Sequence, residues 1–127
     1  MTDIESTVRA YLAAQAGIVA LTATRIYASS YLPPGYQPSA GPALLFTIRG
    51  GSQDYSSHLL EASLYVRCYA ATAAEARQLD RAVYDAFNDV QSGSIKWARL
   101  DVPGQSLQEP ETDWIFVIST YGVLIAN

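Results

Sequence analysis

His58 is the only histidine of the chain, and it follows Asp54 and Ser57 closely in the sequence. A serine nucleophile, a histidine base and an aspartate that orients the base together perform acyl transfer, so these residues are the first candidates for catalysis. The same residue types also gather in polar hairpin turns, where solvent surrounds them. We therefore interpret His58 as a turn residue, and we predict that the chain has no catalytic residues and is not an enzyme.

Other residues with possible chemistry form weaker patterns. Gly50 and Gly51 are not followed by the lysine and helix start of a phosphate-binding loop, so we interpret them as turn glycines. Glu109 and Glu111 are neighbouring carboxylates in a proline-containing segment that does not fix their spacing. A single histidine and a single cysteine, Cys68, leave only scattered carboxylates as metal ligands. We predict no metal, no cofactor, no disulfide and a buried structural thiol.

Length and charge bound the class of protein. A chain of 127 residues is long enough for one core and short for two, so we expect a single domain over residues 1–127. The net charge is -4, Lys96 is the only lysine and the arginines are scattered, which disfavours direct binding to nucleic acid. No apolar run reaches the ~18 residues of a membrane-spanning helix. The first residues also lack a secretory signal, so we expect a cytoplasmic protein without membrane association.

The segment His58–Asn88 organises the predicted fold. Over Leu60–Tyr69 apolar residues alternate with polar or aromatic ones, which predicts a strand with one buried face. Over Ala76–Phe87 the apolar residues recur at helical spacing, which predicts an amphipathic helix. Thr72, followed three residues later by Glu75, has the pattern of a capping box and places the helix start near this threonine.

The N-terminal third predicts a helix, a short strand and a loop. A second capping pattern, Thr2 with Glu5, predicts a first helix over Asp3–Ala16 that ends at Gly17. A brief strand is expected over residues 25–27. The following segment, residues 31–42, contains four prolines and two glycines, which predicts an extended surface loop.

Three further strands complete the predicted sheet. The run Ala43–Arg49 is rich in strand formers, and we expect the two following glycines to end it before a hairpin leads to the strand near residue 58. Ile95–Val102 and Trp114–Ile125 predict the last strands, with a loop over Pro103–Glu111 between them. The expected fold is α+β, with two helices packed on one face of a largely antiparallel sheet of four to five strands.

The predicted loops supply the candidates for protein contacts. Loops with aromatic and charged residues are common contact surfaces, although loop tyrosines also cover the edges of cores, and both roles stay open here. The interface candidates are Tyr31, Tyr36, Arg49, Asp54, Tyr55, Glu109 and Glu111.

The order of these features resembles the tail-terminator family of tailed bacteriophages, also called tail-completion proteins. In that family a short helix leads to a segment like G-x-RIY, and a strand ending in YA precedes a helix containing A-EAR-L. This chain carries TATRIY and LYVRCYAATAAEARQL, with Thr24 in place of the usual glycine. The resemblance spans nearly the whole chain, and the matching residues are Arg25, Ile26, Tyr27, Tyr69, Ala70, Glu75, Ala76, Arg77 and Leu79.

The resemblance implies a structural virion protein that forms a hexameric ring on the head-proximal end of the tail tube. Such a ring ends tail growth and provides the surface that joins the head, so its partners would be the tail tube protein and a neck or connector protein. The resemblance also implies assembly in the host cytoplasm. DNA would pass through the ring without specific binding, which suits an acidic chain with few basic contacts for phosphate.

Two other functions remain open at this stage. A head-completion or connector protein also forms a ring at the phage neck and has a similar size. A small cytoplasmic enzyme or ligand-binding domain would use a pocket between the helices and the sheet. The weak catalytic pattern argues against an enzyme, and the symmetry of an assembled particle would separate the ring proteins from it.

Overall fold

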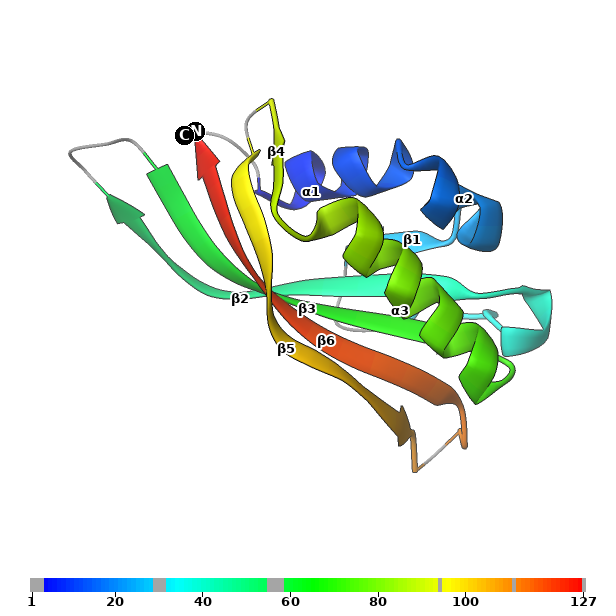
Figure 1. The fold of residues 1–127 in the computed structure, drawn as a ribbon. Helices are drawn as coiled ribbons and strands as arrows, with labels where there is room; N and C mark the ends of the chain where they lie inside the picture. The colour runs from blue at the N-terminus through cyan, green and yellow to red at the C-terminus, as the bar shows by residue number, and fades with distance from the viewer. Residues whose placement is uncertain (1–3, 29–31, 55–58, 94, 111, 127) are drawn as a thin grey trace.

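The computed structural model describes residues 4–28, 32–54, 59–93, 95–110 and 112–126. Figure 1 shows three helices against one curled sheet. In chain order the elements are α1 (Ile4–Ala13), α2 (Ala16–Thr22), β1 (Ile26–Ala28), the 3-10 helix η1 (Pro38–Ala40), β2 (Ala43–Asp54), β3 (Leu59–Ala70), α3 (Ala73–Phe87), β4 (Val90–Ser92), β5 (Ile95–Gln108) and β6 (Ile115–Ala126).

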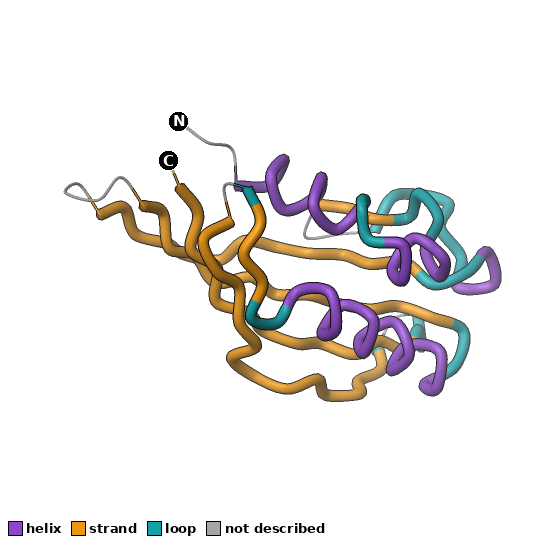
Figure 2. Tube along the Cα trace, turned by 45° about the horizontal axis from the view of Figure 1, so that its top comes forward, coloured by secondary structure: helices purple, strands orange, loops and turns teal. Residues whose placement is uncertain are grey.

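The six strands form one sheet in the order β1-β2-β3-β6-β5-β4. All neighbouring strands run antiparallel except β1 and β2, which are parallel. The three α-helices lie on the same face of the sheet, as Figures 1 and 2 both show. The predicted α+β class, the largely antiparallel sheet and the helices on one face are confirmed. The predicted numbers are wrong, because the described chain has six strands and three α-helices.

The main core lies between the helices and the sheet. On β3 the inward side chains are Leu64, Val66 and Cys68, as the alternation of the sequence predicts. The apolar face of α3 packs on these side chains, and α1 and α2 extend the same core with buried apolar residues of their own. The helical residues buried in this core are Val8, Leu12, Ile18, Leu79, Val83 and Phe87.

A smaller cluster covers part of the opposite face of the sheet. Tyr69, on the outward side of β3, is only 1% exposed and packs with Leu45 of β2. Tyr36, from the proline-rich segment before β2, covers them, and Trp114 and Phe116 pack at the border of the cluster. The proline-rich segment is therefore held on the sheet by aromatic contacts.

Helix α2 is the largest difference from the prediction in the N-terminal third. The predicted helix over Asp3–Ala16 ends already at Ala13, and Gly17 lies inside α2. Glycine is unfavourable within a helix by ~1 kcal/mol, but Ile18 and Thr22 lie one turn apart on α2 and both are buried against the sheet. Packing of this face overrides the local preference of the glycine.

Two strands are longer than predicted, and in both the pairing register shifts where the sequence predicted the strand to end. Strand β2 continues past Gly50 and Gly51, because the antiparallel register with β3 shifts at this point and resumes at Ser52. Strand β5 continues past Pro103 to Gln108, with two register shifts around the proline. Pro103 has no paired residue on β6, because it lies between the pairs Val102–Thr120 and Gln105–Ile118, where the register shifts.

The predicted start of α3 is confirmed. The Thr72 hydroxyl oxygen accepts a hydrogen bond from the Glu75 backbone N–H at 3.2 Å, which satisfies one of the free donors of the first helical turn. The corresponding pattern at the first helix includes Thr2, which lies outside the described residues.

We predict that Leu79→Ala lowers the free energy of unfolding by ~2–5 kcal/mol, because Leu79 is fully buried against β3 and its truncation leaves a cavity. Chemical denaturation followed by circular dichroism measures the change. Gln78→Ala, at the adjacent exposed position, is the control and should change the same quantity by less than ~0.5 kcal/mol. Similar effects of the two substitutions would place Leu79 outside the core.

Candidate functional site

The four interface candidates that the structure describes lie on three different segments of the chain. Arg49 and Asp54 both belong to β2, where their backbones pair with Ser63 and Leu59 of β3. Three further candidates, Tyr31, Tyr55 and Glu111, lie outside the described residues, as does His58. A role of the seven candidates in subunit contacts therefore stays a prediction.

Tyr36 is a candidate that the subunit itself largely covers. It is 7% exposed, and its hydroxyl donates a hydrogen bond to the Gly41 carbonyl oxygen at 2.8 Å. Its ring packs edge-on against Trp114, with the ring centroids 5.5 Å apart. This residue covers the smaller core, which is one of the two roles that the sequence leaves open for it.

Glu109 anchors the turn between β5 and β6. Its Oε1 accepts a hydrogen bond from the Tyr69 hydroxyl at 2.5 Å, and its Oε2 accepts one from the Thr112 hydroxyl at 2.9 Å. The Tyr69 pKa rises to about 12, first because the hydroxyl is buried and then because its hydrogen bond and proximity to the Glu109 carboxylate disfavour a phenolate. The two strands and the turn are thereby tied to the smaller core.

Residues Asp101–Gln108 of β5 form an arm that the sequence predicted as a loop, and we call this segment the β5 arm. All eight residues are exposed, including Val102 at 46% and Leu107 at 44%. Gly104 lies against α3 and β6, where Ser119 donates a hydrogen bond to Asp80 at 2.5 Å. The β5 arm is therefore exposed along its length but fixed at its middle.

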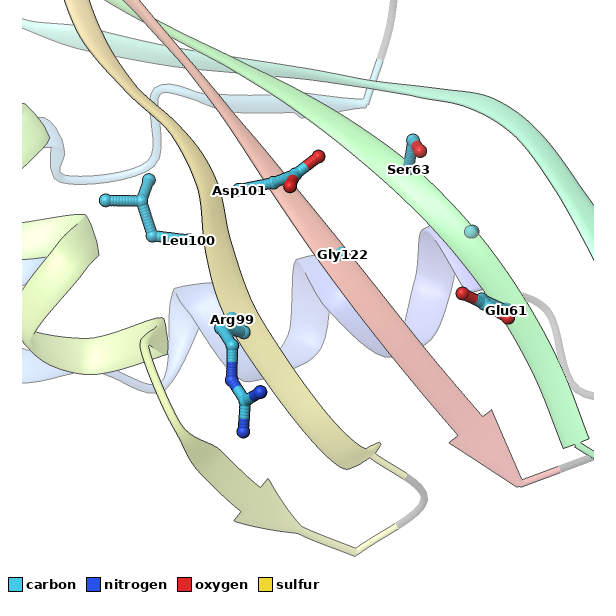
Figure 3. Close-up of a pocket in the computed structure, with 7 residues that line it drawn as sticks. Glu61, Ser63, Arg99, Leu100, Asp101 and Gly122 are labelled. Atoms are coloured by element: carbon cyan, nitrogen blue, oxygen red, sulfur yellow. The ribbon is translucent and has the colours of Figure 1, made fainter.

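A polar hollow of about 420 Å³ lies across β3, β6 and β5. Figure 3 shows Glu61 and Ser63 on β3, Gly122 on β6, and Arg99 and Asp101 on β5 around it. Arg99 stacks its guanidinium over the Trp97 ring at 5.2 Å and donates a hydrogen bond to Asp89 at 3.1 Å. The hollow's lining residues, which also include Ala62 and Leu100, contain a serine but no histidine that could act as its base.

A second hollow of about 450 Å³ lies between α1, α2 and β1, and we call it the helix-edge hollow. Most of its lining is apolar, and Val19 at its side is 37% exposed. Arg9 also lines it and donates a hydrogen bond to the Ile26 carbonyl oxygen at 3.3 Å. The sequence predicts no helix between Gly17 and the strand at residues 25–27, so the part of this hollow that α2 forms was not expected. The complete lining is Arg9, Ala13, Val19, Ala23, Thr24 and Ile26.

Nucleophilic or metal chemistry finds little support among the described side chains. Cys68 is fully buried, and burial together with the nearby Asp80 carboxylate raises the pKa of its thiol well above the usual range. No group of three or more histidine, cysteine, aspartate or glutamate side chains within the described ranges is arranged to hold a metal ion. None of the described helices has the length and apolar character needed to cross a membrane.

Comparison with solved structures gives a match over nearly the whole chain. The fold is similar to a chain from a structure described as the virion of a native gene transfer agent (GTA) particle, with a TM-score of 0.72. The similarity covers 98% of this chain and 95% of the matched chain, at 17% sequence identity. No family model and no curated protein sequence matches. At this identity the similarity establishes a shared fold.

We predict that Gly104→Ala lowers the free energy of unfolding by ~1–3 kcal/mol through overpacking. A Cβ at Gly104 would lie 2.7 Å from both Asp80 Oδ2 and Val117 Cγ1, and 3.1 Å from Ser119 Oγ, which is too close for all three. Thermal and chemical denaturation measure the change.

Gly17→Ala is the matched control for the glycine substitution. No heavy atom lies within 4 Å of its added Cβ, and Gly17 is helical, so this change should raise stability by ~0.5–1 kcal/mol. The two substitutions should therefore change the free energy of unfolding in opposite directions. A neutral Gly104→Ala variant would show that the β5 arm is not held against α3.

The raised Tyr69 pKa predicts a loss of stability at alkaline pH. The phenol has its ordinary pKa of 10.0 when unfolded and a pKa of about 12 when folded, so the folded state holds this proton more tightly. The contribution of the protonated Tyr69 hydroxyl to stability is complete below pH 10 and disappears as the pH rises toward 12. In urea denaturation across this range, Tyr69→Phe should lose less stability than the unsubstituted chain. An equally steep loss in both proteins would contradict the assignment.

Proposed function

We propose that this chain is a structural virion protein that forms a ring on the head-proximal end of a phage-like tail tube. The observation that carries the proposal is the fold similarity to a virion chain, which spans 98% of this protein. The order of sequence features that resembles the tail-terminator family supports the same conclusion independently. The proposed ring contains six copies, stops tail growth and offers the surface that joins the head.

The open surfaces of the fold suit a subunit of an assembly. The α-helices cover one face of the sheet, while Glu61 and Ser63 on the opposite face of β3 are exposed. Tyr27, Tyr65 and Tyr84 are half-buried, so their rings still offer apolar area to a neighbour. Tyrosine suits such contacts because it buries a large ring and keeps a polar hydroxyl.

The charge of the chain suits a ring through which DNA moves. Each lysine or arginine that contacts a phosphate releases counterions and strengthens binding, so many such contacts would hold the duplex in place. With a net charge of -4, the chain favours passage of DNA over retention. We propose the tail tube protein and a neck or connector protein as its partners, and the virion as its location.

A head-completion or connector ring protein at the neck is the alternative. The matched chain belongs to a whole virion, so the fold similarity supports either position in the particle. An enzyme has less support, because the lining of the polar hollow contains no histidine that could act as a base for Ser63.

Electron microscopy of tails from a producing strain tests the proposal. We expect a six-fold ring of this chain at the head-proximal end of the tail tube, and overlong tails without heads when the chain is deleted. Normal tail length with a ring located at the head portal would favour the connector alternative. A single copy, or a location off the tail axis, would disprove both ring functions.

A further inference from the structure

Two apolar surface features lie at opposite edges of the sheet. The helix-edge hollow is beside β1, the first strand of the sheet order, and Val19 is exposed at its side. The β5 arm is at the other edge and exposes Val102 and Leu107. Among the residues whose burial the structure describes, these three are the large hydrophobic side chains that are exposed. One edge therefore offers an apolar recess and the other offers apolar side chains that project.

The β5 arm has a free outer edge. Strand β4 pairs with β5 only between Val90 and Ala98 and between Ser92 and Ile95. At Leu100 the backbone N–H donates instead to the Asn88 side-chain oxygen at 2.8 Å, and no described strand pairs with that edge beyond it. Pro103 and the register shifts beside it are features that protect edges from adding another strand. A partner of the β5 arm therefore binds chiefly through side chains.

Charge is divided between the same two edges. The edge formed by α1, α2 and β1, residues 4–28, includes two arginines, Arg9 and Arg25, and one acidic residue, Glu5. Residues 100–127, which contain the β5 arm and β6, include four acidic residues and neither lysine nor arginine. Arg9 lines the helix-edge hollow, and Asp101 begins the β5 arm. Residues 4–28 are thus net basic and residues 100–127, the acidic edge, are net acidic, so the two segments are complementary to each other in two copies of the chain.

From these observations we propose that the β5 arm of one copy packs into the helix-edge hollow of the next copy. Val102 and Leu107 supply apolar surface that covers Val19, and the acidic edge faces Arg9. The two surfaces are different, so the contact is head-to-tail and can close into a ring. This inference rests on the proposed ring function and specifies which surfaces form it. A nucleic acid is a poor occupant, because the β5 arm and the segment after it are acidic.

Crosslinking between two single-cysteine variants tests the contact. Val19→Cys and Leu107→Cys proteins, one carrying a mass tag, are mixed and treated with a short bis-maleimide. We expect a covalent dimer that contains one copy of each variant, and little product from either variant alone. Native Cys68 is fully buried and common to all samples, so it does not account for a difference between them. Circular dichroism verifies that every variant is folded.

Gln78→Cys, on the exposed face of α3, replaces Leu107→Cys in the control mixture and should give only background product. Equal amounts of same-variant dimers would indicate a two-fold contact and overturn the proposal. Absence of the mixed dimer would also overturn it. If a purified tail tube protein then shields both cysteines from maleimide, the two surfaces bind that partner instead.

The double variant Val19→Cys with Leu107→Cys separates this inference from the proposed ring. Crosslinking it should give a ladder of products that ends at six copies. A ladder that ends at another number would keep the contact and reject the hexamer. A six-fold ring seen on tails, without the mixed dimer, would keep the proposed function and reject this contact.

Discussion

The register of β3 is the constraint on which the rest of the structure depends. This strand pairs over its whole length with β6 and over nearly all of it with β2, so its inward residues sit at the centre of the sheet. A slip by one residue would exchange Leu64, Val66 and Cys68 for the outward residues Tyr65 and Arg67. The helices would then face polar groups, and the core between helices and sheet would be lost. The one-sided cover of the sheet follows from this alternation.

The same arrangement leaves the two edges of the sheet unlike each other. At one edge α1, α2 and β1 enclose an apolar recess, and at the other β5 extends beyond the short strand β4. Figure 2 shows that the helices lie on one side of the strands. A subunit with two different edges favours head-to-tail contacts over two-fold pairing, because each edge is complementary to the other and not to itself. This asymmetry within the fold suits the closed ring that we propose.

The β5 arm is held in place by contacts at two points. At its middle, Gly104 packs against Asp80 and Ser119, which are joined by a hydrogen bond of 2.5 Å. Beyond its end, Glu109 accepts hydrogen bonds from Tyr69 and Thr112. An exposed segment that is already ordered loses less conformational entropy on binding than a flexible one. These internal contacts suit the role in assembly that we propose for the β5 arm.

The sequence by itself determined the α+β class, strand β3 and helix α3, because alternating or helical spacing over ten or more residues leaves one way to bury the apolar side chains. The Thr72 cap and the resemblance to tail-terminator proteins also came from the sequence. Only the tertiary structure decided that Gly17, Gly50 and Pro103 lie inside a helix or a strand. Packing and strand pairing override the local tendency of glycine and proline to end an element. The tertiary structure also decided which surfaces lie at opposite edges of the sheet. Such positions depend on strand order, which local sequence patterns do not encode.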